Sequence, residues 1–351
     1  MATGDLKLGV MLGYWAAQPR HHEDVPIAQE AERLGYDSVW TAEAYGSDAA
    51  TPLAWLGAHT KRIRLGTGLI QMSARTPAMT AMTAATLDHL TEGRLILGLG
   101  VSGPQVVEGW YGQPFAKPLA RTREYVGIVR DILRREGPVT SDGPHYPLPL
   151  PADAPGFAAD GNGALGIGKP LKITTHPRRA DVPIYLGAEG PRNVALAAEI
   201  ADGWLPIFLS PERLDAMYGQ SLAGAKPDFD IAAPVMVSQG ETVEQAIQIV
   251  KWMLGFYIGG MGAEKANFHR DVIGRAGFAE EAQQVQKLFL EGDKMAAVNA
   301  VPDALCDEIA LVGPPGRIKE RLQRWVDSPI SSLLVMSRDP ANLRLIAESL
   351  G

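Results

Sequence analysis

Residues 183–207 read PIYLGAEGPRNVALAAEIADGWLPI. The run at 183–188 is short and apolar, as expected of a buried strand, and 192–200 carries apolar residues at the i, i+3, i+4 spacing of an amphipathic helix. A second short apolar run follows at 203–207. A strand, a crossover helix and a second strand make one unit of a parallel sheet, so this stretch predicts an α/β protein.

The same alternation continues along the whole chain. Eight short apolar runs predict buried strands at 6–12, 38–42, 64–69, 95–99, 183–188, 203–207, 231–237 and 332–336. Helical patterns that can cross back over the sheet lie at 25–34, 52–59, 77–90, 121–133, 192–200 and 211–222. Eight strands with crossover helices fit a closed (β/α)8 TIM barrel better than an open sheet.

Two stretches interrupt this alternation. Residues 137–182 are rich in Gly and Pro and include GNGALGIG at 161–168, which predicts an irregular insertion before the fifth strand, and loops this long usually cover a site. Residues 240–328 predict an all-helical insertion between the seventh and eighth strands. Neither resembles a flexible linker, so the whole chain, 1–351, is expected to form a single domain. The helical patterns of the second insertion lie at 243–254, 280–290 and 317–326.

The composition limits what the protein can do. Hydrophobic residues make up 46% and charged residues 21% of the 351 residues, which is typical of a soluble globular protein. The net charge of −7 disfavours a nucleic acid or a membrane as partner and leaves small molecules. Cys306 is the only cysteine and can form no internal disulfide, so electrons have to come from a bound cofactor.

The apolar run 8–17 follows a single Lys7 and fits a buried strand better than a signal peptide, so a cytoplasmic location is expected.

In a barrel of this type the active site lies at the carboxyl ends of the strands. Most of these exits carry a glycine or an aromatic residue, which suits a flat ring that the backbone approaches closely. For any single exit, a glycine that only makes a tight turn explains the pattern equally well. The exits are 13–15, 41–43, 68–71, 100–103, 187–190, Phe208, Ser238 and 337–338.

The exit GAEGPRN at 187–193 is the most specific of them. A strand runs into a glycine turn, and Pro191 stands where a helix would begin. Free backbone N–H groups and the positive end of the helix dipole would then face a ligand, which predicts a phosphate site in preference to a plain helix cap. Arg192 either adds positive charge to this site or is a solvated residue of the first turn.

Other common site types find little support. GLGVSG at 98–103 matches G-x-G-x-x-G, but glycines and prolines interrupt the following residues and disfavour the long helix of a dinucleotide-binding fold. The seven histidines show no H-x-x-x-H or H-x-H pattern, so surface or capping roles are predicted for them and no metal site is expected. The absence of G-x-S-x-G disfavours a serine hydrolase.

Several segments combine into a set that identifies a family. They are 35–40 with 41–43, 65–68 with 75–77, 93–95 with 98–100, 108–112, Arg121 with Glu124, 187–191 and 199–204. With them the chain resembles the luciferase-like monooxygenase superfamily, in particular its coenzyme F420-dependent oxidoreductases related to methylenetetrahydromethanopterin reductase. The resemblance covers nearly the whole chain. It implies a luciferase-like TIM barrel with a deazaflavin across the strand ends, and a homodimer.

The resemblance also implies where the cofactor lies. It places a non-prolyl cis peptide at Gly68–Leu69 and the cofactor phosphate on the turn 187–191. FMN in place of F420 is the alternative cofactor. Together with the strand exits, the resemblance predicts cofactor contacts from Thr41, Gly68, Leu69, Gln71, Ser102, Gly103, Gly187, Ala188, Glu189, Gly190, Pro191 and Arg192.

The sequence departs from the family at positions that bear on proton transfer. Several members carry a histidine just after the second strand, whereas Ala44 and Tyr45 follow Glu43 here. Pro104 also replaces a glutamate of the related sugar-phosphate dehydrogenases, which disfavours glucose-6-phosphate oxidation. The candidates for proton transfer or positioning are Tyr14, Glu43, Tyr45 and Glu108.

Apolar and aromatic residues near the strand exits suggest the walls of a substrate pocket, with core packing as the competing explanation. They are Trp15, Met72, Trp110, Tyr111 and Phe208. The resemblance implies an oxidoreductase that transfers a hydride between C5 of the deazaflavin and a small organic substrate, and the apolar residues suggest that this substrate is hydrophobic. An FMN-dependent monooxygenase with a separate reductase, and a flavin-binding protein without turnover, are the alternatives.

Overall fold

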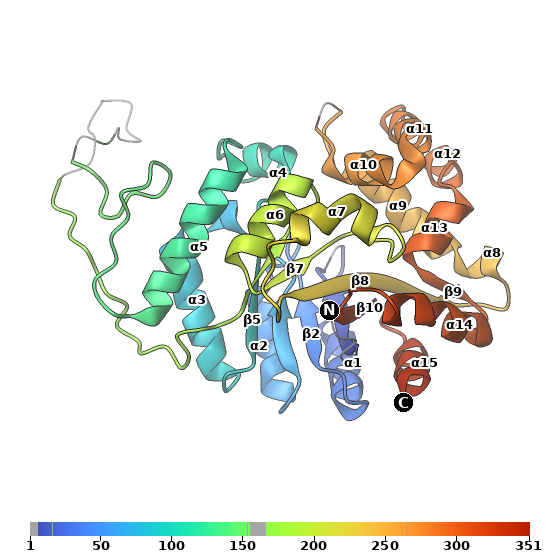
Figure 1. Cartoon of the computed structure of the whole chain (residues 1–351), viewed down its shortest axis with the longest axis horizontal. Coiled ribbons are helices and arrows are strands. Elements are labelled where there is room, and N and C mark those ends of the chain that lie inside the picture. The colour runs from blue at the N-terminus through green and yellow to red at the C-terminus, as the bar shows by residue number, and fades with distance from the viewer. Residues whose placement is uncertain (1–5, 16, 153, 155–165, 265) are drawn as a thin grey trace.

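The computed structural model describes residues 6–15, 17–152, 154, 166–264 and 266–351. Eight parallel strands close into a barrel, because β10 pairs with both β8 and β1. The structure confirms the predicted (β/α)8 TIM barrel (Figure 1). Its strands are β1 (Lys7–Gly13), β2 (Ser38–Thr41), β3 (Arg64–Thr67), β5 (Leu95–Gly100), β6 (Ile184–Gly187), β7 (Gly203–Leu205), β8 (Asp230–Gln239) and β10 (Ser332–Met336).

Helices cover the outside of the barrel between the strands. The start of α3 follows from its sequence: Thr76 accepts a hydrogen bond from the N–H of Met79 at 3.2 Å, and Pro77 occupies the first helical position. In the described part of the chain, no helix is long and apolar enough to cross a membrane. The outer helices are α1 (His21–Arg33), α2 (Ala50–His59), α3 (Pro77–Leu90), α5 (Pro118–Arg134), α6 (Pro191–Ile200), α7 (Leu214–Leu222), α14 (Pro315–Val326) and α15 (Pro340–Leu350).

Large side chains fill the interior of the barrel. Trp40 fits there because Gly66, its partner across the β2–β3 pair, has no side chain: a Cβ at Gly66 would lie 2.1 Å from Cε3 of Trp40. The opposite faces of the strands pack against the outer helices in a larger core. The inner core consists of Met11, Trp40, Ile96, Tyr185, Leu205, Ala232 and Leu334.

Short elements extend the strand ends. β4 (Ile70–Gln71) follows β3 and pairs with the end of β5, and η1 (Met72–Ala74) continues from it. α4 (Pro104–Gly109) begins after β5. These elements surround the carboxyl ends of β3 and β5, where the sequence predicts cofactor contacts.

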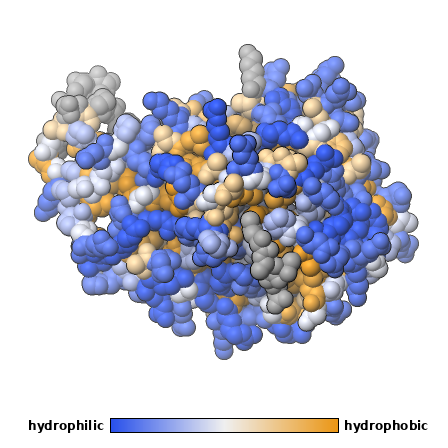
Figure 2. Space-filling model, in the orientation of Figure 1, coloured by the Kyte–Doolittle hydropathy of each residue, from blue (hydrophilic) through white to orange (hydrophobic). Residues whose placement is uncertain are grey.

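Residues 137–182 form an arm beside α5 (Figure 1). Its described residues form no helix, and bridges such as that between Ser141 and Leu148 hold them. Glu124 of α5 anchors the arm by accepting hydrogen bonds from the backbone N–H groups of His145 and Tyr146. Figure 2 shows apolar atoms exposed on this arm, at the left of the view. Residues 161–165 of the glycine-rich stretch lie outside the described residues.

Residues 240–328 hold the remaining helices, which gather over the carboxyl end of β8 (Figure 1). This stretch is not all-helical as expected, because β9 (Leu311–Gly313) pairs in parallel with the last residues of β8. β8 extends beyond the barrel, and β9 pairs with backbone groups that this extension would otherwise leave free. The helices are α8 (Val243–Ala246), α9 (Gln248–Gly260), α10 (Phe268–Ile273), the π-helical η2 (Gly274–Phe278), α11 (Ala279–Leu290), α12 (Lys294–Asn299) and α13 (Asp303–Ile309).

Candidate functional site

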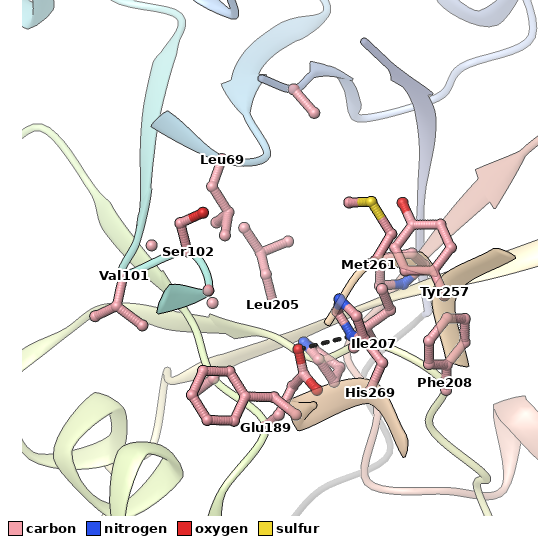
Figure 3. A pocket seen from close by; sticks show the side chains of 18 of the residues that line it. Leu69, Val101, Ser102, Glu189, Leu205, Ile207, Phe208, Tyr257, Met261 and His269 are labelled. Carbon is pink, nitrogen blue, oxygen red and sulfur yellow. Dashed lines mark ion pairs between the residues drawn. The ribbon is translucent and has the colours of Figure 1, made fainter. Parts of the chain in front are cut away.

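A cavity of about 970 Å³ opens at the carboxyl ends of the barrel strands (Figure 3). Its volume is that of a pocket for a small molecule or cofactor. One wall consists of residues that follow the barrel strands, and the other consists mostly of side chains from α9 and α10. The insertion 137–182 was expected to cover the site, but none of its described residues lines this cavity. The arm packs against α5 instead.

The floor of the cavity is a leucine that lies on bare backbone. The peptide bond Gly68–Leu69 is cis, as the family resemblance implies. A Cβ at Gly100 would lie 2.4 Å, and a Cβ at Gly187 2.3 Å, from Cδ1 of Leu69. Side chains do not approach so closely, so both strand exits require glycine for Leu69 to lie there. The exits of β3, β5 and β6 therefore form one continuous surface for a ligand.

The turn from β6 to α6 forms one end of the cavity, and all residues from 187 to 193 line it. In the described structure no side chain caps α6. The N–H groups of Asn193 and Val194 donate to the carbonyl oxygen of Gly190, which leaves the N–H of Arg192 for a ligand. A Cβ on Gly190 would meet no atom within 4 Å, so the space over the turn is open. This helix start is therefore suited to bind an anion such as a phosphate.

Two glutamine side chains place acceptor atoms at the cavity wall. Nε2 of Gln71 donates to the carbonyl oxygen of Ala44 at 2.7 Å, and Nε2 of Gln105 donates to that of Met261. The Oε1 atoms of both glutamines are buried without a hydrogen-bond partner among the described residues. Buried acceptors of this kind are normally satisfied, so a ligand with N–H or O–H groups fits this wall. The sequence singled out Gln71 but not Gln105.

Glu43 lines the cavity, and its carboxylate is held by several donors. It accepts hydrogen bonds from Nη1 of Arg75 at 2.6 Å and from the backbone N–H groups of Gln71 at 2.6 Å and Ala49 at 3.2 Å. Its side chain is only 4% exposed. Tyr14 also lines the cavity, and burial raises the pKa of its phenol.

The other two candidates for proton transfer lie outside the cavity. The Tyr45 hydroxyl contacts the sulfur of Met261 at 3.6 Å, and its side chain is half exposed. Glu108 on α4 accepts a hydrogen bond from the N–H of Phe115 at 3.2 Å and is exposed. Both residues follow strands closely in the sequence, but neither lines the cavity.

Of the residues predicted as cofactor contacts and pocket walls, some line the cavity and others lie outside it. Ser102, Gly103 and Phe208 line the cavity, and Ser102 and Phe208 have positive φ angles of 60° and 52°. The Thr41 hydroxyl donates to the carbonyl oxygen of Ala49 at 2.8 Å and does not line it. The remaining predicted wall residues also lie outside it: Trp15, Met72, Trp110 and Tyr111.

The second wall was missed by the sequence prediction. It is mostly apolar, but it includes His269 of α10, whose side chain is 17% exposed. The predicted surface or capping role of this histidine is therefore wrong. No spacing motif could have found it, because its partner Glu189 belongs to a distant turn of the barrel. The missed residues of this wall are Val250, Met253, Tyr257, Met261, Ala266, Phe268, His269, Ile309 and Ala310.

The described residues offer little redox or metal chemistry of their own. No three His, Cys, Asp or Glu side chains among them gather in a way that could hold a metal ion. Cys306 is buried, and burial raises the pKa of its thiol to about 12. A thiol in this state is a poor nucleophile and a poor electron donor.

Two comparisons of the sequence agree on the family. The model of the family described as luciferase-like monooxygenase matches residues 8–332. A protein of Mycobacterium tuberculosis named "Putative coenzyme F420-dependent oxidoreductase" is 52% identical over 352 residues, which cover 97% of this chain and 98% of that protein. A 5,10-methylenetetrahydromethanopterin reductase of Methanolobus tindarius is 29% identical over 318 residues, 88% of each chain.

Solved structures share the fold. The coenzyme F420-dependent tetrahydromethanopterin reductase from Methanopyrus kandleri has a TM-score of 0.76 at 21% identity, covering 99% of this chain and 98% of that one. The oxygenating constituent of 3,6-diketocamphane monooxygenase from Pseudomonas putida, in complex with FMN, has a TM-score of 0.65 at 18% identity and the same coverage. Because the family model spans nearly all of the barrel, this chain belongs to the luciferase-like monooxygenase family.

Proposed function

We propose that this chain is a coenzyme F420-dependent oxidoreductase that transfers a hydride between C5 of the deazaflavin and a small, hydrophobic organic molecule. One observation carries the proposal. The same cavity is lined by the cis peptide Gly68–Leu69, by the glycine exits of β5 and β6 and by the uncapped start of α6. The relative named for F420 dependence, at 52% identity, supports the choice of cofactor.

The residues of the cavity fit a phosphorylated deazaflavin. The backbone at Arg192 and the open space over Gly190 suit the phosphate, and Leu69 offers a flat apolar support for the ring. The unpartnered oxygens of Gln71 and Gln105 suit its N–H and O–H groups. When bound, the deazaflavin would supply the hydride chemistry. The chain itself binds and orients the reactants and excludes water.

The second wall supports a hydrophobic substrate. Met253 and Tyr257 of α9 and Phe268 of α10 line the same cavity as the strand exits. An apolar wall stabilises an apolar ligand through the hydrophobic effect, at roughly 25 cal/mol per Å² of buried apolar surface. A substrate bound against this wall would lie between the insertion and the cofactor.

A titration of the purified protein with F420 and with FMN, side by side, tests the proposal. We expect F420 to bind more tightly, followed by hydride transfer within a panel of enones, imines and alcohols. Tight binding of FMN without binding of F420 would favour the FMN-dependent monooxygenase, which the fold of the FMN-bound neighbour supports. Binding of F420 without turnover of any panel member would favour a binding protein.

We also propose that the chain forms a homodimer through the outer faces of α2 and α3. α2 contains no Asp, Glu, Lys or Arg, and the only one in α3 is the buried Asp88. Large apolar side chains are about half exposed there, including Trp55 and Met82. Such patches on a soluble protein are usually covered by a partner. Light scattering after gel filtration should find a dimer that M82E dissociates, whereas L290E, on the exposed face of α11, should not. A wild-type monomer at micromolar concentration would contradict this proposal.

A further inference from the structure

We infer that His269 is the group that gives and takes the proton in the proposed hydride transfer, with Glu189 as its positioning residue. The inference rests on the proposed function and adds to it the residue that handles the proton. It also narrows the substrates to those whose reduction adds both a hydride and a proton, such as neutral ketones.

His269 is held with a defined ring orientation at the cavity wall. Its ring packs nearly edge-on against Tyr257 and Phe208, with 5.0 Å and 5.9 Å between ring centroids. Figure 3 shows the ring between Glu189 on one side and Tyr257 and Met261 on the other. These neighbours exclude water from most of the ring and leave its polar edge to the cavity and to Glu189.

The imidazole and the carboxylate face each other in an incomplete interaction. Nδ1 of His269 lies 3.1 Å from Oε1 of Glu189. The pair lacks the alignment of a hydrogen bond, and both this Nδ1 and Oε2 of Glu189 are buried without a hydrogen-bond partner in the described part of the chain. Because Nδ1 faces Glu189, Nε2 is the nitrogen that can serve a bound substrate.

The backbone of Glu189 is in turn fixed by the elements around it. The carbonyl oxygen of Glu189 accepts hydrogen bonds from the Tyr218 hydroxyl at 2.9 Å and from Nη2 of Arg275 at 2.6 Å. The charged and titratable groups around the His269–Glu189 pair are Arg275 of η2, Tyr218 of α7 and Tyr257 of α9. Arg192 follows Glu189 along the turn. Tyr14 and Tyr45 face Tyr257 from the barrel side.

The other acid–base groups of the cavity are less suited to the task. Glu43 is already held by Arg75 and two backbone donors. Burial raises the pKa of the phenols of Tyr14 and Tyr257, so both keep their protons at neutral pH. Histidine exchanges a proton most readily in this range. Ala44 stands where several family members carry a histidine after the second strand, and the insertion supplies an imidazole from the opposite wall.

The proposed step balances as follows for a ketone. The carbonyl carbon accepts a hydride with both of its electrons, the π pair of the C=O bond moves to oxygen, and Nε2 of the protonated His269 gives its proton to that oxygen. The ketone is reduced to an alcohol and the imidazole is left neutral. Oxidation of an alcohol runs the same transfers in reverse. A cationic iminium, in contrast, needs only the hydride, since the electron pair neutralises its nitrogen without a proton.

The test compares H269Q and E189Q with H176Q, a control in which the exchanged histidine is exposed and does not line the cavity. F420 affinity is measured first, by fluorescence titration. Hydride transfer from reduced F420 is then followed with cyclohexanone and with the cationic N-methyl-dihydroisoquinolinium, across a range of pH. A second readout needs no turnover. Cyclohexanone is added to the complex with oxidised F420, and the carbon NMR signals of the histidine rings are followed. The signal of His269 is the one that is lost in H269Q.

We expect H269Q and H176Q to keep their F420 affinity within about twofold. H269Q should slow ketone reduction by roughly 100- to 10,000-fold but leave iminium reduction unchanged. The wild-type ketone rate should fall as rising pH removes the proton from the imidazole, whereas the H269Q rate should not depend on pH. Cyclohexanone should shift the His269 signal and leave that of His176 in place.

Any of five results would overturn the inference. Equal losses with both substrates, or a His269 signal that cyclohexanone does not move, would assign the histidine a structural role. A loss of F420 affinity confined to H269Q would make it a cofactor ligand. An unchanged pH profile in H269Q would place the proton elsewhere, with the proposed function intact. A wild-type protein that binds no F420 would instead refute the proposed function and this inference together.

Discussion

Replacing Gly190 by valine is the most direct test of the anion site. The backbone of Gly190 has φ −82° and ψ 144°, an extended conformation that suits valine. Its Cβ would meet no atom within 4 Å, so the side chain fits without moving the protein. The new methyl groups would, however, fill the space over the start of α6. We therefore expect G190V to fold normally and to bind the cofactor weakly.

The size of the effect follows from the donors that the side chain would block. A hydrogen bond from a backbone N–H to a charged phosphate contributes about 1.5–3 kcal/mol. Each 1.4 kcal/mol is about tenfold in affinity, so loss of the bond from the N–H of Arg192 should raise the dissociation constant roughly 10- to 150-fold. Glycine is better than an apolar residue at a helix N-cap by a margin of about 1 kcal/mol at most, so the stability of the fold should change little.

The assay is a fluorescence titration with F420, together with urea unfolding of each variant. G224V is the matched control, because Gly224 also has open space around its Cβ and lies outside the cavity. It should lose neither affinity nor more than about 1 kcal/mol of stability. Unchanged affinity in a folded G190V would show that the cofactor phosphate does not bind at this turn.

Two further predictions concern stability. R75M should lower the free energy of unfolding in urea by about 3–5 kcal/mol, because it leaves the buried carboxylate of Glu43 without its partner, and E43Q in the same chain should restore part of it. No recovery in the double variant would contradict this account. Burial raises the pKa of Tyr36 above its ordinary value of 10.0, so the unfolded chain loses this proton first as pH rises. Stability should therefore be complete below pH 10 and fall above it, by at most about 1.4 kcal/mol per pH unit for each such tyrosine, and a flat unfolding free energy from pH 9 to 11 would contradict this.

The barrel could be predicted because its signals are local. A buried strand is a short apolar run, and the predicted strand at 332–336 matches β10 (Ser332–Met336) residue for residue. β9 was missed because a run of three residues carries no periodicity. What makes Leu311–Gly313 a strand is the free end of β8, and that end exists only once the barrel has formed.

Half of the site could be predicted for the same reason. In a barrel the strand exits meet at one end whatever the side chains are, so the sequence could place Leu69 with the turn at 187–190. Where an aromatic side chain points is not decided locally. Trp110 follows β5 closely, yet its position at the end of the short α4 leaves it 65% exposed. Tyr257 and His269 reach the cavity only because α9 and α10 pack over β8.

The two walls of the cavity are built from different kinds of atoms, and this difference assigns them different work. The barrel wall is largely backbone: glycines at 100, 187 and 190, a cis peptide and a helix start, which suit the proposed phosphate and flat ring. The insertion wall consists of side chains, which can be exchanged without disturbing the barrel strands. Changes in the turns should therefore alter cofactor affinity, whereas changes at Met253 or Phe268 should alter which substrate reacts.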